Sequence, residues 1–362
     1  MKTTLGIIQD IHQHPERVSD IMRTFQLRMV DRVLVNGDIC QSFHAFSYED
    51  SIAQSQAYSS YILKHLGESG LECYFWAGSH ESIRGFELPA RAFSENYPYL
   101  TYVPQIQKFD FGSLDLIIIP GSDYVSRGGE FHLGTGNLKT GMYISENEKL
   151  SPISPKDLQT IPDEDSVFRY NNMSDLEKLV INPEKTIAIC HIPPRFDFPN
   201  SVDIAHFYQL REYSFNERNE FGYIEKGIFP FEIPTEILLN IRRTDIIPKE
   251  RDESFISLHA QRFMHVYSLD RWQVFVERKT NRGNSQLKDT YNSAGIQVAI
   301  NGHFHESGGR AHTKEGIRID EDKYTKNLFW NPGSLDEGKA GILTISPGID
   351  CGISVSYESI SL

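Results

Sequence analysis

Cysteine is scarce in this sequence, and a signal sequence and long hydrophobic runs are missing from it. Only four of the 362 residues are cysteines, and no two of them stand in a Cys-x-x-Cys pair. This spacing excludes a zinc knuckle and a dithiol redox motif, and it is typical of reduced thiols. The short apolar stretch before Asp10 is not a signal peptide, and no run is long enough to span a membrane. We therefore expect a cytoplasmic protein without a membrane segment.

Basic residues are also in the minority. The chain has 36 Lys and Arg against 49 Asp and Glu, which gives a formal net charge of −13. Nonspecific nucleic-acid binders usually carry the opposite sign, so any surface for a polyanion would have to be local. The hydrophobic content of 39% is enough for a sizeable core. The length suits one large domain with insertions, or two domains.

Short apolar, β-branched runs recur along the chain, and each ends in a polar residue or a glycine-polar pair. The runs are residues 5–8, 33–35, 73–76, 116–119, 187–190, 298–300 and 328–330. Runs this short and this apolar indicate strands that are buried on both faces. Between the early runs, apolar residues return at helical spacing, as in Val18, Ile21, Met22 and Phe25. Strands that alternate with helices predict an α/β fold, in which ligands gather at the carboxyl ends of the strands.

Two regions do not follow the alternation. Residues 124–170 show little periodicity and are expected to form loops. Residues 195–290 are rich in aromatic and charged side chains, with helices expected around His206–Arg218, Thr235–Arg243 and Ser254–Met264. We predict that 195–290 is a partly helical insertion carried on a core of residues 1–194 and 291–362. It would act as a lid, a substrate-selecting element or an oligomer contact, and the oligomeric state is left open.

The polar residues after the strands are carboxylates and imidazoles. They occur in the order Asp10-x-His12, Gly37-Asp38, Gly78-Ser79-His80-Glu81, His191 and Gly302-His303-x-His305. Mixed oxygen and nitrogen ligands without a thiol suit Mn, Fe, Zn, Co or Ni. Six such ligands are too many for one tetrahedral ion, but they suit two ions that share a carboxylate. The series therefore predicts a site for two divalent metal ions.

This ordered series resembles that of the calcineurin-like metallophosphoesterases, whose pattern is D-x-H, G-D, G-N-H-[DE], a lone H and G-H-x-H. The resemblance runs from Gly6 to Ser334, and Asn331–Ser334 also matches the family's N-P-G-S. It implies a four-layer αββα sandwich of two mixed sheets with helices outside. It also implies metal-dependent hydrolysis of a small phosphoester substrate by a metal-activated water.

The resemblance implies a role for each ligand. Asp10, His12 and His305 would bind the first ion. His191 and His303 would bind the second ion. The carboxylate of Asp38 would bridge the two ions. A bridging carboxylate holds two ions about 3.5–4 Å apart. His80 would face the phosphate, where it would stabilise developing charge or protonate the leaving group. The catalytic residues are thus His80 and Asp38.

Ser79 departs from the family pattern, which has asparagine at this position. Its side chain is shorter, and a hydroxyl is a weaker neutral ligand than an amide oxygen. We count Ser79 among the ligands of the second ion, and we expect that ion to be bound more weakly than the first. A protein that has lost its activity and serves as a protein-binding scaffold is one alternative.

The motifs do not decide between monoester and diester substrates, and we favour a phosphodiester or a nucleotide. A nuclease of the same family is the other alternative. A nucleic-acid substrate is not favoured, because a duplex binder needs several basic contacts to phosphate and the chain is acidic overall.

Overall fold

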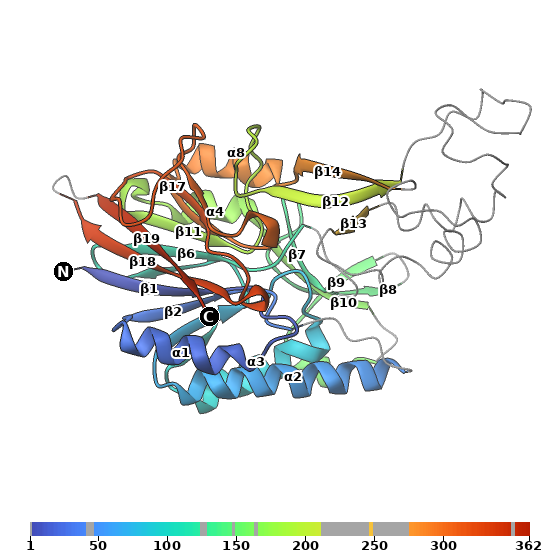
Figure 1. Ribbon diagram of the computed structural model, residues 1–362. Coiled ribbons are helices and arrows are strands. Elements are labelled where there is room, and N and C mark those ends of the chain that lie inside the picture. The colour runs from blue at the N-terminus through green and yellow to red at the C-terminus, as the bar shows by residue number, and fades with distance from the viewer. Residues whose placement is uncertain are drawn as a thin grey trace, which may run out of the picture. The chain divides into compact units, whose positions relative to one another are not determined.

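The computed structural model describes residues 2–40, 47–123, 129–146, 149–162, 166–210, 246–248, 275–348 and 352–362 (Figure 1). The chain divides into two compact units, Met1–Asp203 with Arg282–Leu362, and Ile204–Asn281. No helix in the described parts of the chain is both long and apolar enough to cross a lipid bilayer.

Two six-stranded mixed sheets form the centre of the first unit. The first sheet has the order β19-β18-β1-β2-β3-β4. Its strands are β1 (Thr3–Ile8), β2 (Arg32–Asn36), β3 (Glu72–Trp76), β4 (Leu100–Tyr102), β18 (Lys339–Pro347) and β19 (Ile353–Ser361). β1 to β4 are parallel, whereas β18 and β19 run antiparallel to their neighbours.

The second sheet has the order β16-β17-β15-β11-β6-β5. Its strands are β5 (Gln107–Asp110), β6 (Asp115–Ile119), β11 (Thr186–Cys190), β15 (Val298–Asn301), β16 (Arg310–His312) and β17 (Leu328–Asn331). The four inner strands are parallel, and the two edge strands are antiparallel to their neighbours. Apart from β4, the parallel strands of both sheets are the apolar runs of the sequence.

Two of the described α-helices begin at a residue whose side chain caps them. The α-helices of the first unit are α1 (Arg17–Leu27), α2 (Tyr48–Glu68), α3 (Leu88–Asn96), α4 (Leu176–Leu179) and α8 (Ser285–Ala294). The short helical turns are η1 (Ile83–Glu87, a π-helix), η2 (Asp157–Gln159), η3 (Met173–Asp175), η4 (Pro183–Lys185), η6 (His305–Ser307) and η7 (Leu335–Glu337). The Ser47 hydroxyl accepts from Asp50 N at the start of α2, and Asn284 caps α8 in the same way. Gly295, with φ of 72°, ends α8 in the left-handed conformation that favours glycine.

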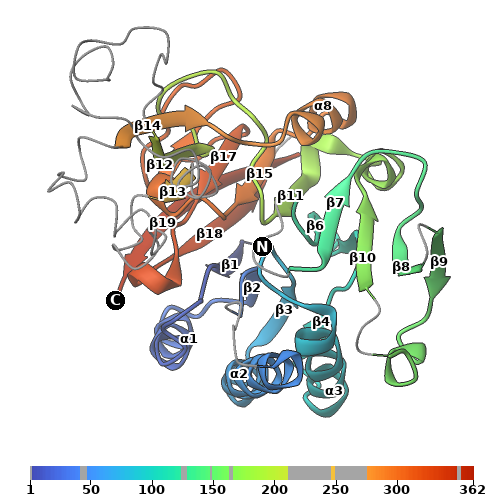
Figure 2. The ribbon, with the colours of Figure 1, turned by 90° about the vertical axis from the view of Figure 1, so that its right-hand side faces the viewer.

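Side chains along the central strands alternate between separate cores, which defines four layers. In β11, Ile187 and Ile189 face the core between the two sheets, whereas Ala188 and Cys190 face a core shared with α4 and α8. In β1, Ile8 faces a third core that is completed by α1, α2 and α3. Figure 2 shows these helices on the outer side of the first sheet and α8 beyond the second. The four-layer αββα sandwich implied by the resemblance is therefore confirmed.

The close packing of α1 on β1 depends on Gly6. A Cβ atom at Gly6 would lie 2.6 Å from the ring of Phe25, which is fully buried. The helix could not approach the strand this closely above any larger residue. Burial of a side chain such as Phe25 stabilises the fold by about 1.5–3 kcal/mol.

The prediction of loops over 124–170 is wrong for the described residues. They contribute a four-stranded sheet of order β7-β10-β8-β9, formed by β7 (Phe131–Gly134), β8 (Gly141–Glu146), β9 (Lys149–Ile153) and β10 (Ser166–Asn172). Along β10 the buried positions are Val167, Arg169 and Asn171. Two of these buried side chains are polar. Buried and more exposed positions therefore alternate along β10, but apolar and polar residues do not. Arg169 reaches Glu87 at 2.6 Å, and the side-chain amide of Asn171 donates to Pro120 O.

The second unit contains the antiparallel sheet β13-β12-β14, formed by β12 (Ile204–Leu210), β13 (Ile246–Pro248) and β14 (Phe275–Asn281). The helix expected to begin at His206 is wrong for residues 206–210, which lie in β12. The rest of that helix, and the expected helices at Thr235–Arg243 and Ser254–Met264, fall outside the described residues.

Candidate metal centre

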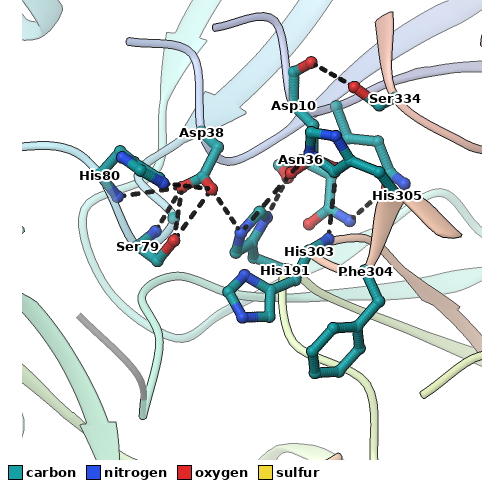
Figure 3. A network of polar contacts seen from close by, with 12 residues as sticks. Asp10, Asn36, Asp38, Ser79, His80, His191, His303, Phe304, His305 and Ser334 are labelled. Atoms are coloured by element: carbon teal, nitrogen blue, oxygen red, sulfur yellow. Dashed lines mark hydrogen bonds and ion pairs between the residues drawn. The ribbon is translucent and has the colours of Figure 1, made fainter. Parts of the chain in front are cut away.

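Each predicted ligand follows the carboxyl end of a parallel strand in one of the two large sheets. Asp10 and His12 follow β1, Asp38 follows β2, Ser79 and His80 follow β3, His191 follows β11, and His303 and His305 follow β15. β1, β2 and β3 are neighbours in the first sheet, and β11 and β15 are neighbours in the second. Parallel strands bring their carboxyl ends to the same edge, so these side chains meet there. Figure 3 shows Asp38 with Ser79 and His80 on one side and His191 on the other.

The backbone at this edge is in an unusual conformation. Asp10, His12, Asp38 and His303 have φ angles of 51°, 42°, 46° and 70°. Residues other than glycine rarely adopt this left-handed conformation, and each one costs on the order of 1–3 kcal/mol. Such residues persist only where the surrounding structure holds them, and they cluster at functional sites.

The seven carboxylate and imidazole residues form three overlapping groups. In each group the potential ligand atoms all lie within 4.8 Å of one another, and the groups are Asp10 with His12 and His305, Asp38 with His191 and His303, and Asp38 with His12 and His80. Asp10 Oδ1 lies 3.5 Å from His305 Nε2 and 3.8 Å from His12 Nε2. Two ligands of one ion, each about 2.1 Å from it, lie roughly 3–3.5 Å apart. The spacing therefore fits donors that share cations, with Asp38 and His12 each common to two groups.

The tautomer of His191 gives a test of whether this cluster suits a cation. His191 Nδ1 lies 2.9 Å from Asn36 O, and a carbonyl oxygen only accepts, so Nδ1 carries the proton. In the neutral ring Nε2 then presents a lone pair, and it lies 3.1 Å from Asp38 Oδ2. Two electron-rich atoms at this distance require a proton or a cation between them. Burial alone lowers the pKa of His191, but the Asp38 and Asp10 carboxylates raise it to about 10.

The carboxylate of Asp10 also needs a compensating positive charge. Asp10 Oδ1 is buried, and it has no hydrogen-bond partner among the residues that the structure describes. An unpaired buried carboxylate oxygen is costly unless a cation faces it. The residues present therefore fit the pair of divalent ions that the sequence predicts.

His12, His303, Asp10 and Asp38 are in the protonation states that metal ligands need. Burial lowers the pKa of His12 to about 3 and that of His303 to about 4, so both rings are neutral at pH 7. Burial alone raises the pKa of each aspartate, but the histidines outweigh this effect. His305 and His191 lower the pKa of Asp10, and His191 and His80 lower that of Asp38.

Asp38 is held by the loop that follows β3. Its Oδ1 atom accepts from the backbone N–H groups of Ser79 and His80, at 2.5 and 3.0 Å. The buried Ser79 hydroxyl donates to Asp38 Oδ2 over 2.9 Å. The hydroxyl of Ser79 is therefore directed to the carboxylate expected to bridge the two ions.

Several buried polar residues beside the ligands had no role in the sequence-based prediction. Gln9 donates to Asn331 Oδ1 over 2.9 Å and accepts from Asn36 Nδ2 over 3.0 Å. Asn36 in turn accepts from His191 through its carbonyl oxygen. Gln9 follows the apolar strand β1 and Asn36 ends β2, and they lie within two residues of Asp10 and Asp38, which is the signal that could have identified them.

Glu81 was part of the recognised motif but had no assigned role. Its two oxygens accept from Cys40 N over 2.9 Å and from Gly78 N over 2.7 Å. Burial raises its pKa to about 7. Glu81 thus joins the loops after β2 and β3, which carry Asp38 and His80. Asp123 is exposed and accepts from Asn284 Nδ2.

Comparison with known proteins shows the family to which this chain belongs. The family model described as calcineurin-like phosphoesterase matches residues 3–224, which is more than half of the chain. The chain therefore belongs to the calcineurin-like phosphoesterase family. No curated protein matches it.

Solved structures with a related fold share little sequence with it. TT1561 of Thermus thermophilus is 9% identical with a TM-score of 0.46, covering 100% of this chain and 99% of that one. A dimetal phosphatase from Danio rerio is 11% identical with a TM-score of 0.43, covering 99% and 98%. An archaeal phosphodiesterase is 12% identical with a TM-score of 0.25, covering 46% of this chain and 99% of its own.

Proposed function

We propose that this protein hydrolyses a phosphoester, with a phosphodiester or nucleotide as substrate, at a centre for two divalent cations. One observation carries the proposal. Two carboxylates and five imidazoles converge at one sheet edge, and buried Asp10 Oδ1 has no hydrogen bond within the described residues. Family membership supports the reaction type.

The ligand assignment follows the three groups of donor atoms. Asp10, His12 and His305 would hold the first ion, Asp38 would bridge, and His191 and His303 would hold the second. When bound, two such cations lower the pKa of a water between them and neutralise charge on the phosphoryl oxygens. Manganese, iron, zinc, cobalt and nickel all suit this donor set.

His80 is the residue proposed to act on the substrate. Its backbone N–H is tied to Asp38, and its Nε2 atom lies 3.8 Å from Asp38 Oδ2. Its side chain keeps 9% of its surface exposed. From this position a protonated His80 would stabilise charge on the phosphoryl group or pass its proton to the leaving oxygen.

Ser79 makes the two cation positions unequal in this proposal. The first position has Asp10, His12 and His305 besides the bridge. The second has two imidazoles, and the Ser79 hydroxyl near it donates to Asp38. A hydroxyl that donates to the bridging carboxylate adds little as a separate ligand, so the second ion is bound more weakly.

The rest of the proposal concerns the insertion and the cell compartment. The second unit, Ile204–Asn281, lies in the chain between the loops of His191 and His303, which supports a role as a lid or substrate-selecting element. The cysteines Cys40, Cys73 and Cys190 are free and buried, which supports a reducing, cytoplasmic location.

Hydrolysis of bis(p-nitrophenyl) phosphate and p-nitrophenyl phosphate tests the function. We expect turnover with Mn²⁺, loss of turnover with a chelator, and a faster reaction of the diester. His12→Ala should abolish turnover, while the matched control His14→Ala should keep it, because the His14 side chain is 43% exposed and pairs with Glu16. Absence of turnover with every divalent metal would identify a binding scaffold instead.

A further inference from the structure

The loop between β1 and α1 contains two left-handed residues that are not glycine. Asp10 and His12 have φ angles of 51° and 42°, and they are separated only by Ile11. Side chains with a Cβ atom avoid this conformation in an open loop. Contacts from outside the loop must therefore hold it, and both residues carry ligands proposed for the first ion.

The carbonyl oxygens of both residues are held by hydroxyl groups from distant parts of the chain. Asp10 O accepts from Ser334 Oγ over 2.9 Å and from Asp336 N over 3.0 Å (Figure 3). His12 O accepts from the hydroxyl of Tyr58, which projects from α2. Ser334 is fully buried.

Further contacts to the same loop come mostly from the main chain. Asp10 N donates to Gly37 O over 3.2 Å, and Ile11 N donates to Asp38 O over 2.9 Å. Main-chain contacts of this kind do not depend on the identity of the side chains. The hydroxyls of Tyr58 and Ser334 do, so they are the sequence-specific means of holding the two carbonyl groups.

We propose that Tyr58 and Ser334 are positioning residues for the first cation, an inference that rests on the proposed function. By holding the carbonyls of His12 and Asp10, they keep both residues left-handed and direct one imidazole and one carboxylate toward the same point. Loss of either hydroxyl lets the loop relax toward an ordinary conformation. The first ion is then bound more weakly, whereas His191 and His303 lie on other loops and keep their arrangement.

Tyr58→Phe is the cleanest test, because it removes one oxygen atom and leaves the ring in place. Calorimetric titration with Mn²⁺ should show the tighter binding step weakened by about tenfold, as for other residues that orient metal ligands. The visible absorption bands of the Co²⁺ form should shift, because they report ligand geometry. Tyr61→Phe is the matched control on the same helix, since Tyr61 is 46% exposed. It should bind Mn²⁺ like the wild type.

Ser334→Ala is the second variant, and it should weaken the same binding step. Its thermal unfolding must be measured in parallel, because Ser334 Oγ also accepts from Asp336 N over 3.1 Å and caps η7. Unchanged Mn²⁺ affinity and an unchanged Co²⁺ spectrum in Tyr58→Phe would overturn the inference. If the wild type itself bound no metal, the proposed function would fail instead, so the two failures are distinguishable.

Discussion

The hydroxyl of Ser79 donates to Asp38 Oδ2, the oxygen that also lies 3.1 Å from His191 Nε2. The carboxylate of Asp38 thereby accepts from three donor groups of two consecutive residues, the N–H and hydroxyl of Ser79 and the N–H of His80. This arrangement fixes the carboxylate firmly. It also engages the Ser79 hydroxyl, which we predicted as a further ligand of the proposed second ion.

Ser79→Asn should strengthen binding of the second ion, because an amide oxygen is a better ligand than a hydroxyl and reaches farther. We expect the weaker step in a Mn²⁺ titration to tighten by about tenfold, with no change in the tighter step. Ser79→Ala is the control, and it should not tighten either step. Equal stoichiometry and affinities in the wild type and Ser79→Asn would contradict the assignment.

His80→Ala should retain both metals and lose turnover by about 10²–10⁴-fold, the usual contribution of a general acid. The choice of leaving group separates its two proposed roles. A proton donor matters less for p-nitrophenol than for a poorer leaving group such as phenol, so the loss should be larger with phenyl esters. An equal loss with both esters would leave charge stabilisation as the role of His80.

His312 should make the protein less stable in mild acid. It is buried, its Nε2 atom accepts from Val202 N over 3.1 Å, and its Nδ1 atom donates to Thr313 O over 2.8 Å. Burial lowers its pKa, opposed in part by Asp203 and supported by Arg310. The unfolded state thus binds the proton more readily.

This difference in proton binding decides whether stability rises or falls with pH. The stabilisation that neutral, buried His312 gives the folded state is complete above about pH 6.5, the pKa of histidine in the unfolded chain. It is lost as the pH falls below that value. Thermal unfolding between pH 8 and 5 should show a shallower acid decline in His312→Gln than in the wild type. The exposed His14→Gln serves as the control. Parallel pH profiles for His312→Gln and the wild type would contradict the prediction.

Removal of Arg169 should destabilise the fold strongly. Its Nη2 atom lies 2.6 Å from Glu87 Oε1, and both side chains are buried. In Arg169→Ala, Arg91 is the one cationic partner left to Glu87 among the described residues. Removing one partner of a buried ion pair lowers the free energy of unfolding by about 3–5 kcal/mol. Lys178→Ala, which breaks an exposed pair with Asp175, should cost less than about 1 kcal/mol in denaturant unfolding. A similar loss in the free energy of unfolding for both variants would show that burial does not determine how much an ion pair stabilises this fold.

The small sheet shows why part of the fold could not be predicted. Seven strands of the two large sheets, β1, β2, β3, β6, β11, β15 and β17, are almost wholly apolar and buried, so their runs are visible in the sequence. β10 instead buries Arg169 and Asn171, whose partners Glu87 and Pro120 are distant in the chain. A polar residue at a buried position has no hydropathy signal until its partner is known.

The ligand set was recognisable because chemistry and order both appear in the sequence. Asp10, Asp38, His191 and His303 each follow an apolar run, and parallel strands must bring such positions to one edge. The amino-acid order alone therefore determined the α/β class and the donors that we propose as metal ligands. The tertiary structure decided what holds those donors: the Ser79 hydroxyl on Asp38, the tautomer of His191 and the hydroxyls on the β1 loop. These contacts join residues separated by tens to hundreds of positions, and only folding places a donor opposite its acceptor.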